Sequence, residues 1–148
     1  MRWIHDVSTD ANDPPQFVAL RAARLACANG VEYSGLRAAE HRMRYADLQT
    51  VVFPQAPAFL FKAALAAANI LQWEIAATVE AEGRIEATAT TRLLRFKDDV
   101  VIRIRKHNGG AKLDLRSASR VGRTDLGANA WRIRHFLQEL NILLKTNT

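Results

Sequence analysis

The fold of this chain is decided by the stretch at residues 100–120, which reads VVIRIRKHNGGAKLDLRSASR. Apolar residues alternate with charged ones on both sides of the central Asn108-Gly109-Gly110, a pattern typical of two strands that each bury one face. Asparagine and glycine accept the positive φ angles that a tight hairpin turn requires. The stretch therefore predicts an antiparallel hairpin with one apolar face and one face of arginine and aspartate.

The position of the turn decides which charged residues face each other across this hairpin. A two-residue turn that starts at Asn108 places Arg103 opposite Asp114. A turn that starts at Gly109 places Arg105 opposite Asp114 instead. Both registers pair opposite charges across the strands, and both leave an excess of arginine on the charged face.

The residues around the hairpin carry the signals of further strands and of two helices. The predicted elements are a helix at 58–71, strands at 73–79 and 84–90, the hairpin, and a helix at 126–144. Alanine and leucine favour the first helix, and an apolar stripe at helical spacing marks the second. Thr124 or Asp125 can cap the start of the second helix.

The N-terminal part of the chain, residues 1–57, gives weaker signals. It is predicted to be irregular, with a short helix at 35–46 capped by Ser34. The expected fold class is therefore α+β. We expect a single domain in which an antiparallel sheet of about four to six strands packs against two long helices, with residues 58–148 as its core.

Positive charge is concentrated in the C-terminal half of this 148-residue chain, whose net charge is +6. Residues 92–134 include 12 basic and four acidic side chains, a net charge of +8, whereas the rest of the chain is at −2. Such a segment favours an anionic small molecule, a lipid headgroup or an acidic protein surface as partner, and a solvated face without a partner explains it equally well. Nucleic acid is disfavoured because the basic strands carry no stacking aromatic residue.

Several classes of protein are excluded by residue types that the chain lacks. A lone cysteine, Cys27, excludes an intrachain disulfide and makes a thiolate metal site improbable. No stretch is apolar enough to cross a membrane, and residues 1–13 lack the apolar core of a signal peptide, so the chain is expected to be soluble as given. We expect no cofactor and no metal, the weak alternative being a hard cation at His5 and the aspartates that follow it.

Polar residues gather where the second hairpin strand leads into the C-terminal helix. Arg116 and Arg120 can each grip a phosphate or carboxylate through two hydrogen bonds, and backbone amides at the start of the helix would add to such a site. The predicted ligand-binding residues are Arg103, Arg105, Arg116, Ser117, Ser119, Arg120, Asp125, Asn129 and Arg132, with Thr9 and Asp10 closing over them from the N-terminal segment. The function that follows is a non-enzymatic module that binds an anionic ligand or an acidic partner.

The same residues also fit a purely structural network. In that alternative Asp125 caps the helix and pairs with Arg116 or Arg120, which are buried at the corner between strand and helix.

A small hydrolase is a second alternative, in which Ser117 or Ser119, or a water activated by an aspartate, attacks the substrate. A serine nucleophile needs a base, and the base needs a group that orients it. None of the four histidines, His5, His41, His107 and His135, sits at a metal-ligand spacing. The alternation of the strand also places the arginines on one face and the serines on the other, so one ligand cannot use both.

Motifs along most of the chain resemble those of one protein family. Residues 116–133 read RSASRVGRTDLGANAWRI. The shorter motifs are His5-Asp6-Val7-Ser8-Thr9-Asp10, Tyr33-x-Gly35, Tyr45-x-Asp47, Trp73-Glu74-Ile75 and Phe96-Lys97-Asp98-Asp99. Together, over roughly residues 4–140, they resemble the bacterial family catalogued as domain of unknown function 1499, apart from Ala46, where that family tends to have proline.

The resemblance implies no activity, because none is assigned to that family. Many of its members carry transmembrane segments or a lipoprotein signal ahead of this domain. It therefore implies a setting at the cell envelope, with a cytoplasmic location as the alternative.

Overall fold

The computed structural model describes residues 3–146 and contains the predicted hairpin. Its strands are β5 (Lys97–His107) and β6 (Gly110–Ser119). Asn108 and Gly109 form the turn with φ angles of 45° and 82°, as a hairpin turn with two left-handed residues requires. The turn thus starts at Asn108, and Arg103 lies opposite Asp114.

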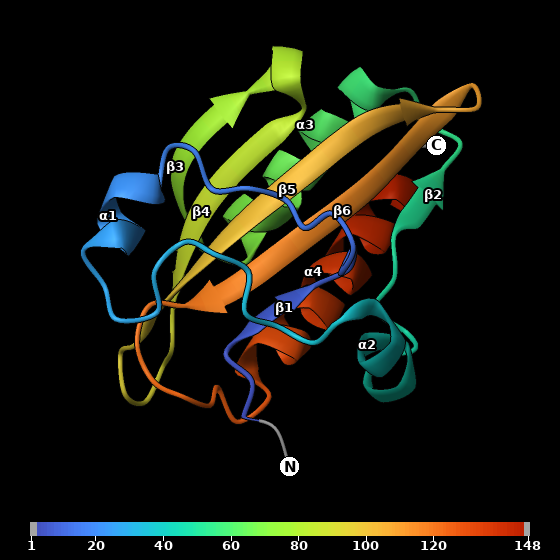
Figure 1. Cartoon of the computed structure of the whole chain (residues 1–148). Helices are drawn as coiled ribbons and strands as arrows, with labels where there is room; N and C mark the ends of the chain where they lie inside the picture. The colour runs from blue at the N-terminus through green and yellow to red at the C-terminus, as the bar shows by residue number, and fades with distance from the viewer. Residues whose placement is uncertain (1–2, 147–148) are drawn as a thin grey trace.

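The hairpin forms the middle of a six-stranded antiparallel sheet (Figure 1). The other strands are β1 (Asp6–Ser8), β2 (Val51–Phe53), β3 (Glu74–Val79) and β4 (Arg84–Thr90). The order across the sheet is β1-β6-β5-β4-β3, and β2 also pairs with β6. A 3-10 turn, η1 (Glu80–Glu82), connects β3 to β4. The fold is therefore α+β, as predicted.

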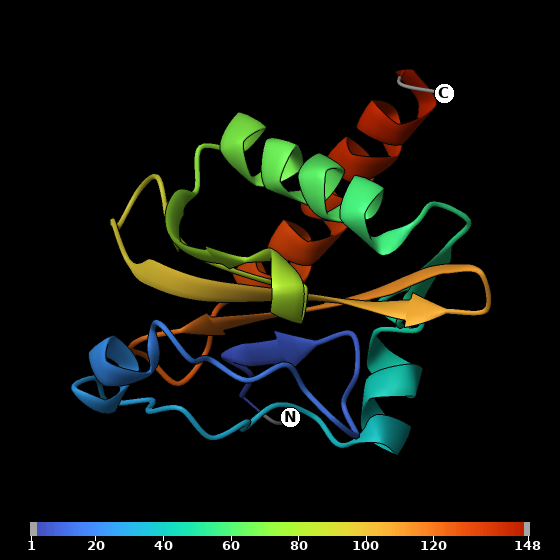
Figure 2. The ribbon, with the colours of Figure 1, turned by 90° about the horizontal axis from the view of Figure 1, so that it is seen from above.

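Two helices cover the apolar face of the sheet (Figure 2). They are α3 (Pro57–Ile70) and α4 (Ala128–Thr146). The buried residues between helices and sheet include Leu60, Phe61, Ile85, Val100, Ile102, Ile104, Leu113, Leu115, Ile133, Phe136 and Leu140. The Trp73 ring stacks on that of Phe136 with centroids 5.4 Å apart. In residues 3–146 no helix is both long enough and apolar enough to span a membrane.

The N-terminal segment covers the opposite, charged face of the sheet (Figure 2). This segment contains α1 (Arg21–Leu25) and α2 (Ala38–Arg44). Its Phe17 and Leu20 form a small apolar cluster with Val101 and Ala118 of the sheet. The remaining contact is polar, and the buried side chains on this face of the sheet include Glu86, Thr88, Asp99, Asp114 and Arg116. Both faces of the sheet are therefore covered, one by an apolar core and the other by a polar one.

Two of the three predicted helices begin a few residues later than predicted. Ser34 caps no helix, because α2 begins at Ala38 and the Ser34 amide instead donates to the Asp6 carboxylate at 3.1 Å. The C-terminal helix begins at Ala128 because Leu126 and Gly127 have left-handed φ angles of 53° and 85°. The Asp125 carboxylate does accept hydrogen bonds from backbone amides of this first turn, as predicted.

Candidate functional site

The sheet separates the predicted site residues into two groups. Arg103, Arg105, Arg116 and Arg120 lie on the face covered by the N-terminal segment, together with Thr9 and Asp10. Ser117, Ser119, Asn129 and Arg132 lie on the face covered by α4, together with Asp125. The predicted split between arginines and serines is confirmed, so a single ligand cannot contact both groups.

Arg116 is completely buried, and its guanidinium has partners from three separate segments. Its Nε and Nη2 atoms donate to the two Asp6 carboxylate oxygens at 3.0 and 2.8 Å. The backbone carbonyls of Pro15 and Val31 accept further bonds at 3.2 and 3.0 Å. The Phe17 ring lies 4.8 Å from the guanidinium carbon. The predicted pairing of Arg116 with Asp125 is wrong, because β1 brings Asp6 to the edge of β6.

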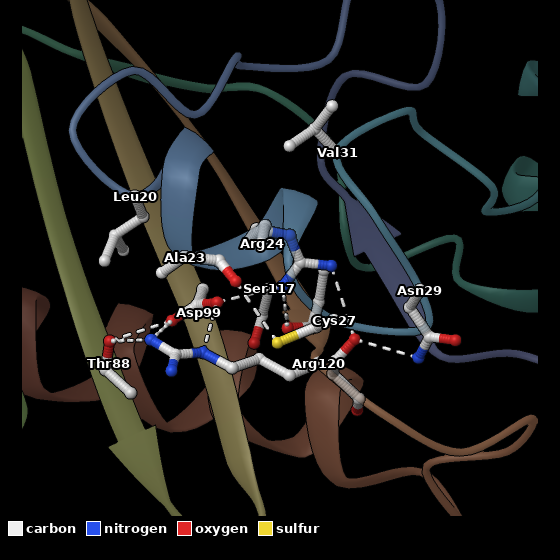
Figure 3. A network of polar contacts seen from close by, with 12 residues as sticks. Leu20, Ala23, Arg24, Cys27, Asn29, Val31, Thr88, Asp99, Ser117 and Arg120 are labelled. Atoms are coloured by element: carbon white, nitrogen blue, oxygen red, sulfur yellow. Dashed lines mark hydrogen bonds and ion pairs between the residues drawn. The ribbon is translucent and has the colours of Figure 1, made fainter.

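Asp99 forms the centre of a second buried cluster (Figure 3). One of its carboxylate oxygens accepts from Arg24 at 3.0 Å and from the Nε of Arg120 at 2.9 Å. The other accepts from the Nη2 of Arg120 and from the Thr88 hydroxyl at 3.0 and 2.8 Å. The hydrogen bonds to Asp99 raise the pKa of Arg120. Arg120 is thus paired with Asp99 and not with Asp125, although a fifth of its side chain is exposed.

The third cluster on this face contains the remaining predicted residues. Arg103 forms ion pairs with Asp10 at 3.2 Å and Asp114 at 3.3 Å. Asp13 is near both Arg103 and Arg105, at 3.6 and 3.5 Å. The cluster holds three carboxylates and two guanidiniums, so it carries no excess of positive charge. The Thr9 hydroxyl donates to Asp114 at 2.7 Å. Thr9 therefore contacts a carboxylate that is already paired with Arg103.

On the helix-covered face, Asn129 connects the two serines. The Ser117 hydroxyl donates to the Asn129 side-chain carbonyl at 2.6 Å, and the amide of Asn129 donates to the Ser119 hydroxyl at 3.0 Å. Arg132 donates to the Ser117 hydroxyl at 3.1 Å and forms an ion pair with Asp98 at 2.8 Å. Both serines are buried beneath α4, and no histidine side chain of residues 3–146 hydrogen-bonds to either hydroxyl. This geometry argues against Ser117 or Ser119 as a nucleophile, because both hydroxyls are buried and engaged with Asn129.

Sequence reasoning missed four residues on which this polar core depends. These are Asp6, Arg24, Glu86 and Asp99. Glu86 is fully buried and accepts hydrogen bonds from the three backbone amides that precede α1, at residues 18–20. Each partner is distant in the sequence, so for Asp6, Glu86 and Asp99 the available signal is a charged residue at an inward-facing strand position, and Arg24 in α1 has no such signal. Among residues 3–146, no group of three or more histidine, cysteine, aspartate or glutamate side chains is arranged to hold a metal ion.

Exposed positive charge gathers instead at one end of the sheet, which we call the loop end. The loop end consists of residues 91–97, which are the loop between β4 and β5 together with the first residue of β5, and residues 120–127, between β6 and α4. Both segments lie at the same end of the sheet (Figure 1), and they are joined at their bases, where the Arg120 amide donates to the Lys97 carbonyl at 3.1 Å. Its exposed cations are Arg92, Arg95, Lys97 and Arg123. Asp125 is the one acidic residue in these segments, and its carboxylate is occupied by the start of α4.

Comparisons with known proteins place the chain in a family without assigning it an activity. The crystal structure of Ara h 8.0201 is similar, with a TM-score of 0.51 and 14% identity over 66% of this chain and 95% of that one. At this identity the likeness shows the fold alone. No curated protein matches the chain. The family model described as "Protein of unknown function (DUF1499)" matches residues 6–140, and the chain therefore belongs to this family, as its motifs predicted.

Proposed function

We propose that this chain is a non-enzymatic binding module that recognises an anionic partner through the loop end. The main evidence for this proposal is the distribution of the arginines. On the charged face of the sheet, Arg103, Arg116 and Arg120 are paired with buried carboxylates, and the half-exposed Arg105 is paired with Asp13. The cations of the loop end are instead exposed beside a single acidic residue. Unneutralised surface charge of one sign attracts partners of the opposite sign.

In this proposal the strand-to-helix motif supports the binding surface. Arg116, Ser117, Ser119 and Asn129 fix the end of β6 against β1 and α4, and thereby hold the 120–127 loop in place. Arg120 links the two functions, because it is anchored on Asp99 and still a fifth exposed at the base of the loop end. The partner classes are those expected from the charge: an anionic small molecule, a lipid headgroup or an acidic protein surface. A setting near the bacterial cell envelope agrees with them.

A soluble polyphosphate is a suitable probe, because it offers anionic charge without an apolar phase. Its affinity for the chain is measured by fluorescence anisotropy at low and at physiological salt. One variant carries Arg92→Gln, Arg95→Gln, Lys97→Gln and Arg123→Gln. A matched control carries Arg37→Gln, Arg42→Gln, Lys62→Gln and Lys106→Gln, all exposed and all outside the loop end. Each set lowers the net charge from +6 to +2.

We expect the loop-end variant to bind polyphosphate at least about tenfold more weakly than the control variant, because close charges contribute far more than charges beyond one Debye length. Equal losses in the two variants would show that net charge alone attracts the probe, and would contradict the proposal. Absence of binding by the unmodified chain at low salt would contradict it as well.

A further inference from the structure

The loop end also carries large apolar side chains that are between about half and almost fully exposed. They are Leu93, Leu94, Phe96, Val121 and Leu126, with Trp131 just beyond on the first turns of α4. Leu93 and Leu126 are each 90% exposed, and Trp131 is 60% exposed. Isolated exposed apolar residues are normal on a protein surface, but a group of them at one site marks an interaction surface.

Two observations indicate that this exposure is unfavourable for the isolated chain. Leu126 adopts a left-handed φ of 53°, which a leucine side chain disfavours, and yet its side chain packs against almost nothing. Leu93 and Leu94 occupy the outer part of a loop, where polar residues or glycine are usual. None of these three leucines belongs to the apolar core of this chain. Their exposed apolar surface is therefore available for contact with a partner.

Basic residues stand next to several of these apolar residues in the sequence. In the first segment Arg92 precedes the two leucines, Arg95 follows them, and Lys97 follows Phe96. In the second segment Arg123 lies between Val121 and Leu126. The core of a protein–protein interface is depleted of charge, whereas basic residues flanking inserted apolar ones are typical of proteins that lie at a membrane interface.

The exposed apolar residues of the loop end come from two loops and from the helix that follows the second loop. The two loops lie at the same end of the sheet (Figure 1) and are joined at their bases by the hydrogen bond from the Arg120 amide to the Lys97 carbonyl. Trp131 flanks them, with its ring 4.5 Å from that of His135. Tryptophan prefers the headgroup level of a bilayer, where its apolar ring and polar N–H both find partners.

From these observations we infer that the loop end docks onto an anionic lipid bilayer. The leucines and Phe96 enter the boundary between headgroups and acyl chains, and the surrounding cations contact lipid phosphates. This inference rests on the proposed function and names its partner: a lipid surface rather than an acidic protein or a soluble anion.

The test is sedimentation with vesicles of phosphatidylcholine containing roughly 30% phosphatidylglycerol, compared with phosphatidylcholine alone. The apolar variant carries Leu93→Ser, Leu94→Ser and Leu126→Ser. Its matched control carries Met43→Ser, Ile70→Ser and Ile142→Ser, which replace exposed apolar residues elsewhere on the surface. Both variants keep every charge, and circular dichroism checks that both are folded. Polyphosphate binding is measured on the same preparations.

We expect the unmodified chain and the control variant to bind the anionic vesicles, with weaker binding at high salt. The apolar variant should bind them at least about tenfold more weakly, while its affinity for polyphosphate stays unchanged. Vesicle binding that is equal in the apolar and control variants would overturn the bilayer inference and leave the proposed function standing. Polyphosphate binding without any vesicle binding would overturn it too, in favour of a soluble anion or an acidic protein. If the unmodified chain bound neither polyphosphate nor the anionic vesicles, both proposals would be overturned.

Discussion

Replacing Arg116 by methionine should destabilise the fold strongly, because it leaves a buried carboxylate without its counter-charge. Methionine keeps much of the side-chain volume but none of the donors to Asp6, Pro15 and Val31. Breaking one side of a buried ion pair costs about 3–5 kcal/mol. A chain of this size loses roughly 2–4 °C of melting temperature for each kcal/mol, so the expected decrease is about 10 °C. A loss of about 3–5 kcal/mol is a large fraction of the roughly 5–15 kcal/mol that stabilise a typical domain.

Thermal and urea unfolding of the variant give the size of this loss. Arg105→Met is the matched control, because this arginine is half exposed and should change stability by less than about 1 kcal/mol. The double variant Asp6→Asn with Arg116→Met should recover part of the loss, since it removes both buried charges and retains a polar side chain near the Ser34 amide. A melting temperature of Arg116→Met within about 3 °C of the unmodified chain would refute the assignment of this arginine to the scaffold.

Three further changes test other parts of the structure. Glu86→Ala removes the acceptor of three backbone amides, so it should lower the free energy of unfolding by about 2–4 kcal/mol and speed hydrogen exchange at residues 18–20. Unchanged exchange at these residues would contradict the role of Glu86 as their anchor. Ser117→Ala should cost about 1–3 kcal/mol and leave polyphosphate binding intact, whereas lost binding in a folded variant would return the serine to the site. Hydrogen bonds from Arg134 lower the pKa of Asp47, so the stability from this pair is present above the ordinary aspartate pKa and is lost as the pH falls through the lowered value of the folded state. Because both side chains are about half exposed, this pair contributes no more than about 1 kcal/mol to stability. Arg134→Ala should return the Asp47 pKa to its ordinary range in an NMR titration. An unchanged titration would show that Arg134 is not what lowers this pKa.

The central hairpin and the helices against it could be predicted because their signals are local. Alternation over residues 100–116 predicts the faces of β5 and β6, and it leaves two registers open. The structure selects the register in which the turn starts at Asn108 and Arg103 lies opposite Asp114. Strands β1 and β2 gave no such signal, because each has three residues and forms only by pairing with β6.

The candidate site was predictable to the level of the strand face and no further. Alternation separated the arginines from the serines, but it could not show that Asp6 pairs with Arg116 across 110 positions, or Asp99 with Arg24 across 75. Only the assembled sheet brings these residues together. The residues of the loop end are visible in the sequence as two leucines between arginines, but their exposure depends on the fold placing both loops at one end of the sheet.

The most direct test of the division between scaffold and binding surface is an amide chemical-shift map of the ¹⁵N-labelled chain titrated with polyphosphate. We expect the largest saturating shifts at residues 91–97 and 120–127, with residues 112–118 and the Thr9–Asp10 segment nearly unchanged. Shifts concentrated on Thr9, Asp10 and the β6 residues around Arg116, with the loop end unaffected, would contradict this division and place the anion site within the buried motif.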